Sequence, residues 1–395
     1  MSVVFVAMQG ISHLKRMRPL IAGVTRRGET AHVFAEPPLR AIAEEAGGVF
    51  HDVFENRPQE QESQPRPVRN VTFAGEHAES LAAELKVLGA RLVVYDTFAP
   101  VGRAVGHALG LPYVNVCAGH AVDPSQPQRF MSLADGHRPL IVSDRCRRAV
   151  DVLRERYGFD DASPLSYMTS FSPHLNVYCE PPAFLDATIR PRFEPVAFLG
   201  SLSPDAERDG GDALFGGAEL RVYASLGTIA WRYFSDAMLA ALEAVAAAVE
   251  SRADAQAIIS LGNSGADPAS LRRPRVTVRP WVDQWAALRD ADVFVTHHGL
   301  NSTHEAIWHR IPMLGYPLFG DQPGQAADCA RMGLSIALGE GTRAPLTEDD
   351  VHAALDALEG ERVEMHGALE RARAEEARVI AGRDELVDRL LKLAG

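Results

Sequence analysis

The amino-acid sequence predicts two α/β domains in series, each built on a doubly wound parallel sheet. Short apolar runs alternate with amphipathic stretches along the whole chain, which is typical of strand–helix–strand units. A length of 395 residues suits two domains of similar size. A stretch rich in Ser, Pro, Asp and Gly near 201–217 separates two such series, and we interpret it as a linker.

Strand candidates follow one another in each half of the chain. In the first half they are 3–7, 32–35, 48–53, 91–95, 113–116 and 176–178. In the second half they are 221–225, 257–260, 276–279, 293–296 and 312–316. The predicted division is a first domain at 1–203, a linker at 204–217, a second domain at 218–378 and a C-terminal helix at 379–395 that packs back on the first domain. The segments 56–70 and 117–142 are expected to be loops, the first of them exposed.

Composition excludes several classes of protein. The hydrophobic content of 46% with 23% charged residues is that of a globular protein, and no apolar run approaches the ~20 residues that span a bilayer. The apolar start at 1–7 lacks a basic leader and a cleavage site, so it predicts a core strand. A net charge of −12 opposes nucleic-acid binding. Four scattered cysteines indicate neither a zinc site nor a disulfide framework, so a cytoplasmic protein without stable membrane association is expected.

Small and polar residues follow a predicted strand of the second domain. The strand at 293–296 leads to His297 and Gly299, and Asn301 and Ser302 come directly after. Backbone N–H groups at the carboxyl edge of a parallel sheet and at a helix N-terminus form an anion site. Each residue also has an ordinary explanation, because Ser or Asn caps helices and a single His often belongs to a core. Together they favour a phosphate site.

The segment from Trp281 to Gln322 resembles the signature box of the family 1 glycosyltransferases. This family includes plant secondary-metabolite enzymes and bacterial enzymes that decorate antibiotics. The matching pieces are Trp281 with Gln284, the run His297-His-Gly-Leu-Asn-Ser-Thr with Glu305, and Asp321 with Gln322. The resemblance implies the GT-B fold, in which two Rossmann-like domains face a cleft. It also implies that the second domain binds the nucleotide-sugar donor and that the first binds the acceptor.

The resemblance assigns parts of the donor to individual residues. Trp281 would stack on the base, and Gln284 and Glu305 would bind the ribose. The diphosphate would lie against His297, Gly299, Asn301 and Ser302, and the sugar hydroxyls against Asp321 and Gln322. The run from Ser225 to Thr228 is similar to the family's phosphate-contacting turn. Leu300 stands where plant members have Trp, which leaves the identity of the sugar open.

The first domain carries a separate pair of candidates. His13 follows the first predicted strand and Asp96 follows the strand at 91–95, so both emerge at the carboxyl edge of one sheet. Imidazole, with a reference pKa of about 6.5, suits a general base near pH 7. In the family, a His at this position takes the proton of the acceptor hydroxyl and an Asp orients it. The alternatives are helix capping by His13, and by Asp96 for a helix that starts near Pro100.

One position departs from the family pattern. Family members usually have Pro three residues after the His, where this chain has Arg16, and the proline comes at Pro19. The helix is therefore expected to begin late and to leave 13–17 as a turn. Lys15, Arg16 and Arg18 would then either lie near the cleft and favour an acidic acceptor, or form a solvated helix face.

The sequence thus predicts an inverting, metal-independent glycosyltransferase without a cofactor. Asp290 and Asp292 match a metal-binding Asp-x-Asp pattern, but a helix-to-strand junction explains both. The expected ligands are a nucleotide diphosphate sugar, with UDP slightly favoured over dTDP, and a small-molecule acceptor, in a monomer or homodimer. Two alternatives stay open. One is a sugar-nucleotide 2-epimerase of the same fold, and the other is a non-catalytic partner protein of a transferase.

Overall fold

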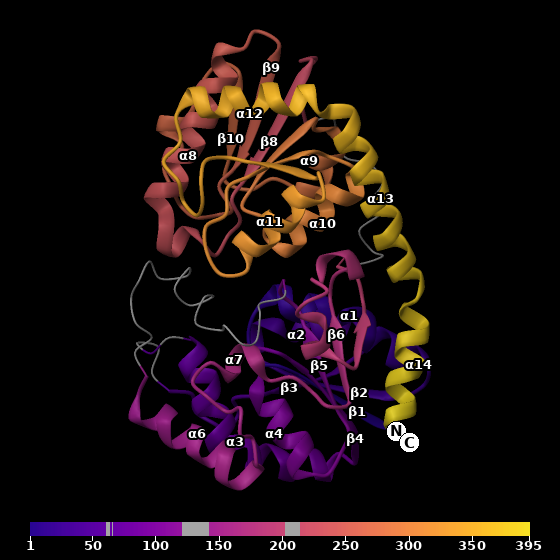
Figure 1. The fold of residues 1–395 in the computed structure, drawn as a ribbon. Coiled ribbons are helices and arrows are strands. Elements are labelled where there is room, and N and C mark those ends of the chain that lie inside the picture. The colour runs from indigo at the N-terminus through magenta and orange to yellow at the C-terminus, as the bar shows by residue number, and fades with distance from the viewer. Residues whose placement is uncertain (61–63, 65, 121–141, 202–213) are drawn as a thin grey trace. The chain divides into compact units, whose positions relative to one another are not determined.

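The chain folds into two compact units (Figure 1). The computed structural model describes residues 1–60, 64, 66–120, 142–201 and 214–395. Among these, the first unit comprises the residues up to Ser201 together with Arg378–Gly395, and the second comprises 214–377. Residues 121–141 of the second predicted loop and 204–213 of the predicted linker lie outside the described residues.

A parallel seven-stranded sheet organises the first unit, in the order β3-β2-β1-β4-β5-β6-β7. Its strands are β1 (Ser2–Ala7), β2 (Thr30–Ala35), β3 (Val49–Asp52), β4 (Ala90–Asp96), β5 (Tyr113–Cys117), β6 (Leu175–Tyr178) and β7 (Val196–Phe198). Its helices are α1 (Ile11–Arg26), α2 (Arg40–Glu45), α3 (Arg66–Val87), α4 (Pro100–Ala108), α6 (Asp144–Tyr157) and α7 (Ser166–Thr169), with short 3₁₀ turns η1 (Pro37–Leu39), η2 (Pro182–Phe184) and η3 (Arg190–Phe193).

A second parallel sheet, of six strands, organises the other unit in the order β10-β9-β8-β11-β12-β13. The strands are β8 (Leu220–Ser225), β9 (Ala255–Ser260), β10 (Val276–Arg279), β11 (Val293–Thr296), β12 (Met313–Gly315) and β13 (Ser335–Ala337). The helices are α8 (Trp231–Ser251), α9 (Gln284–Asp290), α10 (Leu300–His309), α11 (Gln322–Arg331), α12 (Glu348–Gly360) and α13 (Arg362–Ala381), with the 3₁₀ turn η5 (Ala269–Leu271).

Each sheet is buried between helices, as near-continuous apolar strands require. In the first unit β1 and β4 pack against α3 and α4, and the fully buried Val4, Val6 and Val93 belong to this core. In the second unit the core lies between β8, β9 and α8, with α12 packed against α8. The predicted doubly wound α/β fold is therefore confirmed in both halves of the chain.

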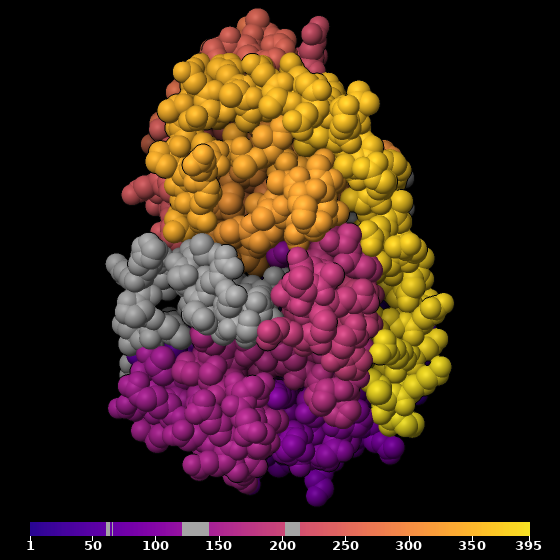
Figure 2. All heavy atoms as spheres, in the orientation of Figure 1, coloured from indigo at the N-terminus to yellow at the C-terminus, as the bar shows by residue number. Residues whose placement is uncertain are grey.

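The last helix, α14 (Arg383–Leu393), packs on α1 within the first unit. Gly23 of α1 permits this approach, because a Cβ at that position would lie 2.5 Å from a methyl of Val387. Nε of Arg27 also lies 2.6 Å from the Asp388 carboxylate. The outer faces of α13 and α14 form part of the exposed surface, drawn in yellow in Figure 2.

All eleven predicted strands are present, and within the described parts of the chain two further strands were missed. The missed strands, β7 and β13, are three residues long and lie at sheet edges, where short runs carry little periodic signal. The expected exposed loop at 56–70 is confirmed in part: 56–60 is irregular with Asn56 and Pro58 exposed, but burial within it and the end at 66–70 differ. Glu60 is buried, and α3 begins at Arg66, because the apolar side chains that follow pack in the core.

The late start expected for the first helix is also wrong. Helix α1 begins at Ile11 and contains Pro19 in its interior. An interior proline costs about 3 kcal/mol. The buried stripe of Leu14, Met17 and Leu20 continues across it, and packing of this stripe outweighs the cost. No helix among the described residues is long and apolar enough to cross a membrane.

Candidate active site

Both sheets reverse their strand order at one point, and the predicted site residues lie there. In the first unit the reversal falls between β1 and β4, which pair with each other. From β1 the strand order continues to β2 and β3 on one side, and from β4 to β5, β6 and β7 on the other. In the second unit it falls between β8 and β11. Loops at the carboxyl ends of such strands separate and leave room for a ligand. The topology therefore provides one candidate site in each unit.

In the first unit the structure brings His13 and Asp96 together. Nδ1 of His13 lies 2.6 Å from Oδ2 of Asp96, a charge-assisted distance. The Asp96 side chain is 3% exposed and that of His13 is 17% exposed, so water reaches the imidazole but barely reaches the carboxylate. Because Asp96 occupies Nδ1, Nε2 is the ring nitrogen left for a substrate. This is the arrangement of a general base held by an orienting carboxylate.

Capping does not explain either residue. The N-cap of α4 is Ala99, and the second oxygen of Asp96 instead accepts a 2.7 Å hydrogen bond from the backbone N–H of Phe98. The N-cap of α1 is Gly10, with a φ of 106° that favours glycine. His13 lies inside the first turn of α1. The alternative interpretation of both side chains as helix caps is therefore wrong.

Sequence reasoning missed a residue beside the His13 imidazole and two residues that contact that neighbour. Phe98 lies with its ring centroid 4.5 Å from that of His13, and Tyr167 of α7 stacks on Phe98 at 4.1 Å. Asn70 of α3 donates to the Phe98 carbonyl at 2.8 Å, while its Oδ1 is buried without a hydrogen-bond partner among the described residues. Phe98 thus gives the base an aromatic neighbour, which Tyr167 and Asn70 hold in place. Only the Phe98 position, two residues after Asp96, carried a signal in sequence.

The basic cluster of α1 does not act as a unit. Arg16 is 4% exposed and donates to the backbone carbonyl of Ser201, whereas Lys15 is exposed. Neither expectation fits Arg16, because the side chain lies in the interior of the first unit rather than on a solvated face or at a cleft mouth. Its position within α1 places it on the same buried stripe as its neighbour Met17.

In the second unit, glycines on both sides of His297 hold its imidazole in place. A Cβ on Gly227, after β8, would lie 2.6 Å from Nε2 of His297, and a Cβ on Gly299 would lie 2.5 Å from the same atom. Real Cβ atoms do not approach this closely, so only glycine fits at either position. The turn after β8 and the loop after β11 therefore both pack against the His297 ring.

A third loop packs against the first. A Cβ on Gly262, after β9, would lie 2.6 Å from the Gly227 carbonyl oxygen and 3.2 Å from Cγ2 of Thr228. Three neighbouring loops at the carboxyl edge thus form one stack, with Gly262, Gly227, His297 and Gly299 in sequence across it. Contacts of this kind between loops leave no trace in a single sequence.

Burial keeps the histidines of this stack neutral. It lowers the pKa of His297 to about 4, against a smaller opposing effect from the Ser225 backbone. The pKa of His298 falls further, to about 3, chiefly through burial and then through the neighbouring His297. His298 is fully buried and contacts Thr303 Oγ1 at 3.2 Å and Ser335 Oγ at 2.9 Å. His298 is therefore a structural residue that ties β11, α10 and β13 together.

Three residues that were predicted to bind the nucleotide sugar form one hydrogen-bond network. Nε2 of Gln284, at the start of α9, lies 2.7 Å from Oε2 of Glu305 and 3.1 Å from Oγ of Ser302. The N-cap side chain of Asp283 fixes the start of α9 by accepting from the N–H groups of Trp285 and Ala286. Glu305 is thereby held in a fixed orientation by Gln284.

The N-terminus of α10 adds backbone donors. Its N-cap is Gly299, so Asn301 and Ser302 lie in the first turn and do not cap the helix. The capping explanation for them is wrong. The first-turn N–H groups of a helix have no intrahelical acceptor, and together with the helix dipole they favour an anion.

The other residues predicted to bind the nucleotide sugar follow strands at the same edge of the sheet. Trp281, between β10 and α9, is 59% exposed, and Thr228 is exposed after β8. Ser225, the last residue of β8, is 7% exposed. Asp321 is the N-cap of α11, and Oε1 of Gln322 accepts from the N–H groups of Leu318 and Phe319. That oxygen shapes the loop, which leaves Nε2 of Gln322 for a ligand.

Asp290 and Asp292 lie at the amino end of β11, away from these residues. Arginines engage both carboxylates. Arg221 lies 2.8 Å from Asp292, and Arg289 lies 3.0 Å from Asp290. Hydrogen bonds from Arg289 lower the pKa of Asp290. For Asp292, burial opposes the shift, but hydrogen bonds from Arg221 prevail and lower the pKa. Within the described residues there is no cluster of three or more potential metal ligands.

Comparison with known proteins relates the second unit to a family of transferases. Residues 215–366 match the family model described as "UDP-glucoronosyl and UDP-glucosyl transferase". Zeaxanthin glucosyltransferase from Pantoea ananas is 27% identical over 267 residues, which cover 60% of this chain. The alignment spans 57% of that relative's length. The predicted resemblance to glycosyltransferases is thus confirmed for the part of the chain that carries the predicted donor residues.

Solved structures match nearly the whole chain. The glycotransferase of kitacinnamycin superposes with a TM-score of 0.77 over 99% of this chain and 98% of its own, at 21% identity. A spinosyn rhamnosyltransferase complexed with thymidine diphosphate superposes with a TM-score of 0.67 over 98% of this chain and 100% of its own, at 20% identity. The chain therefore has the GT-B fold of these glycosyltransferases, and over residues 215–366 it carries the sequence of the UDP-glucoronosyl and UDP-glucosyl transferase family.

Proposed function

We propose that the protein is an inverting glycosyltransferase that transfers a hexose or deoxyhexose from a nucleotide diphosphate sugar to a hydroxyl of a small molecule. The observation that carries the proposal is the 2.6 Å contact between His13 and Asp96. A transferase needs an acceptor base, whereas a protein that only binds a nucleotide sugar does not. The family match over 215–366 supports the donor half of the proposal.

In the proposed reaction the acceptor oxygen attacks the anomeric carbon of the sugar. The hydroxyl proton passes to Nε2 of His13, and the Asp96 carboxylate stabilises the imidazolium that forms. The bond from the anomeric carbon to the diphosphate oxygen breaks, and its electron pair leaves with the diphosphate. Attack opposite the leaving group inverts the anomeric centre.

The departing diphosphate gains negative charge, and residues of the second unit are proposed to stabilise it. The first-turn N–H groups of α10 and the hydroxyl of Ser302 supply donors without a metal ion. His297 supplies an N–H from a neutral ring, since its pKa of about 4 keeps it uncharged. Retained activity after exhaustive chelation would support this role, and activity that depends on an added divalent cation would contradict it.

For the donor base, UDP is proposed ahead of dTDP. Gln284 holds the Glu305 carboxylate where it can accept from ribose hydroxyls, and UDP keeps the 2′-hydroxyl that dTDP lacks. Thermal-shift measurements with UDP and dTDP sugars test this choice, because a ligand at 100 times its Kd stabilises the fold by about 2.7 kcal/mol. Stronger stabilisation by dTDP sugars, as in the neighbour that holds thymidine diphosphate, would reverse it.

The function itself is tested by incubating the protein with nucleotide sugars and a panel of hydroxylated small molecules, with product detection by mass spectrometry. Replacing His13 by Ala should lower kcat by about 10²- to 10⁴-fold. Replacement of the exposed His366 is the matched control and should leave kcat unchanged. Product formation from the nucleotide sugar alone would instead indicate an epimerase. Donor binding without turnover of any acceptor would indicate a non-catalytic partner.

A further inference from the structure

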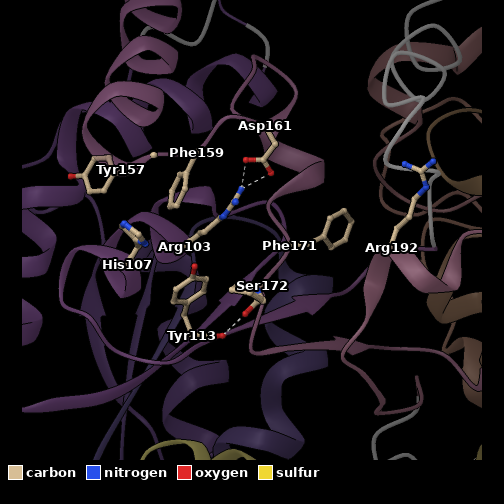
Figure 3. Close-up of a pocket in the computed structure, with 11 residues that line it drawn as sticks. Arg103, His107, Tyr113, Tyr157, Phe159, Asp161, Phe171, Ser172 and Arg192 are labelled. Carbon is tan, nitrogen blue, oxygen red and sulfur yellow. Dashed lines mark hydrogen bonds and ion pairs between the residues drawn. The ribbon is translucent and has the colours of Figure 1, made fainter.

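A pocket lies at the opposite edge of the first sheet from His13 and Asp96 (Figure 3). The pocket is widely open to solvent and has a volume of about 480 Å³. Tyr113 is the first residue of β5, and Ser172 precedes β6, so the pocket lies at the amino ends of these strands. The carboxyl ends, where Asp96 closes β4, are separated from it by the length of a strand, about 15 Å. None of the residues assigned to transfer lines this pocket.

Aromatic side chains form much of its wall. They come from three segments of the first unit: β5, the end of α6 with the turn after it, and the segment before β6. The rings are those of Tyr113, Tyr157, Phe159 and Phe171. Tyr113, Tyr157 and Phe159 are each less than 7% exposed, so these rings are fixed by the core behind them. A rigid aromatic wall suits a flat ring and costs little entropy on binding.

The Arg103 side chain places a positive charge in this wall. The guanidinium of Arg103 lies 4.1 Å from the centroid of the Phe159 ring, and its Nη1 lies 2.8 Å and 3.0 Å from the two oxygens of Asp161. Nε of Arg103 is buried without a hydrogen-bond partner among the described residues. The Phe159 ring, Asp161 and the Tyr113 side chain together orient the guanidinium, while Nε keeps an unsatisfied donor, which is costly unless an acceptor takes it.

The charge of the lining is positive. Arg103 and Arg192 carry guanidinium groups, and His107 contributes an imidazole, against the single carboxylate of Asp161. Figure 3 shows Phe171 between the two arginines. Asp161 is 51% exposed at the rim, so its carboxylate can move into water and leave Arg103 to another anion. A carboxylate on a flat ring satisfies both the cation and the aromatic wall.

We propose that this pocket is a second ligand site that takes a small aromatic carboxylate, separate from the transfer site. The carboxylate binds Arg103 in place of Asp161, and the ring lies among Tyr157, Phe159 and Phe171. Volumes of 300–1,000 Å³ are usual for small-molecule sites, so the pocket admits one such ligand. The site goes beyond the proposed transferase activity and does not depend on it.

Calorimetric titration with sodium benzoate tests the site. Benzoate should bind, while benzamide, which lacks the charge, and cyclohexanecarboxylate, which lacks the flat ring, should bind at least tenfold more weakly. R103A should lose benzoate binding. R40A is the matched control, because Arg40 also lies over a phenylalanine ring, at 4.2 Å from Phe50, and pairs with a carboxylate. R40A should bind benzoate as the unaltered protein does.

A second variant keeps the test decisive if R103A fails to fold. D161N removes the competing charge at a half-exposed position and should tighten benzoate binding several-fold. Binding that is absent in the unaltered protein overturns the proposal, as does equal binding of all three probes or weaker binding by D161N. Tighter binding by D161N together with loss in R103A supports it.

Discussion

Each unit has one candidate site, and the histidines of the two sites lie in opposite environments. His13 contacts a carboxylate at 2.6 Å, whereas His297 is flanked by glycines and His298 is bound by two hydroxyl groups. Burial depresses the pKa of the second-unit histidines to about 4 and 3. A carboxylate partner prepares an imidazole to gain a proton, while neutral surroundings prevent this. The comparison teaches that residue type alone does not distinguish a base from a neutral donor, and that the contacts of the ring do.

Replacing Asp96 by Asn tests whether the carboxylate contact makes His13 a base, and we expect the largest effect here. The Asn amide donates to Nδ1 of His13 and forces the hydrogen onto Nε2, which is the tautomer that cannot accept a proton there. We expect kcat to fall by about 10²- to 10⁴-fold, measured with saturating donor and acceptor. Donor affinity, measured separately by calorimetry, should not change. A variant with normal turnover would exclude His13 as the base.

The pH dependence of stability tests the neutral state of His298. As pH falls below 6.5, the unfolded imidazole takes up a proton, but folded His298, with a pKa of about 3, does not. The unfolded state then binds more protons, so the folded state loses stability as the pH falls. Between pH 7 and pH 5 this amounts to about 2 kcal/mol.

The variant H298N suits this measurement, because Asn tolerates the positive φ of 56° at this position. It should be less stable than the unaltered protein at pH 7, since the contacts to Thr303 and Ser335 change. Urea unfolding at the two pH values should nevertheless show a smaller difference for H298N, by about 2 kcal/mol. An unchanged difference would mean that His298 is protonated in the folded protein.

Replacing Gly299 by Ala tests whether the position of the His297 ring matters for donor binding. The backbone of Gly299, with φ of −66° and ψ of 142°, is allowed for alanine, so the added methyl acts only through its contact with His297. We expect donor Kd to rise about tenfold, a loss of about 1.4 kcal/mol. G217A is the control, since a Cβ there meets no described atom within 4 Å.

The double variant H297A/G299A completes this test. Once the imidazole is gone, the methyl at 299 has nothing to displace, so the double variant should bind donor no worse than H297A alone. Additive losses would show that Gly299 acts on the donor directly and not through the ring.

The smallest expected effect concerns the exposed Trp281. Its replacement by Ala removes the proposed stacking on the base, and loss of such a contact weakens binding by about 1 kcal/mol. Donor Kd should rise severalfold while kcat stays constant, because stacking is equal in the ground state and the transition state. A fall in kcat at unchanged Kd would place Trp281 outside the donor site.

Sequence periodicity predicted the two sheets because buried parallel strands are continuous apolar runs. It failed at α1, where the pattern around Pro19 suggested a late start and the packing of Leu14 and Met17 carries the helix through. It also failed at Glu60, whose burial depends on a hydrogen bond from Thr72, twelve residues away. Local pattern does not contain such contacts.

For the candidate sites, motifs identified the residues but not their surroundings. The His13–Asp96 contact joins residues 83 positions apart, and both the predicted strand order and the family resemblance pointed to it. Phe98, Tyr167 and Asn70 were missed because only the folded chain places Phe98 against His13 and places α3 and α7 against Phe98. Gly299 and the turn that contains Gly227 were assigned to phosphate, but the sequence did not show that both glycines leave space for the His297 ring.

The stacking of the loops after β8, β9 and β11 has a consequence for anyone who wishes to redesign donor choice. Gly262, Gly227 and Gly299 each leave space that a neighbouring loop fills, so a library that varies one loop alone will mostly sample clashes. Grafts from a related enzyme should exchange all three loops together with His297. The three loops at this edge must therefore be changed together, and substitution of single residues will underestimate how readily donor preference changes.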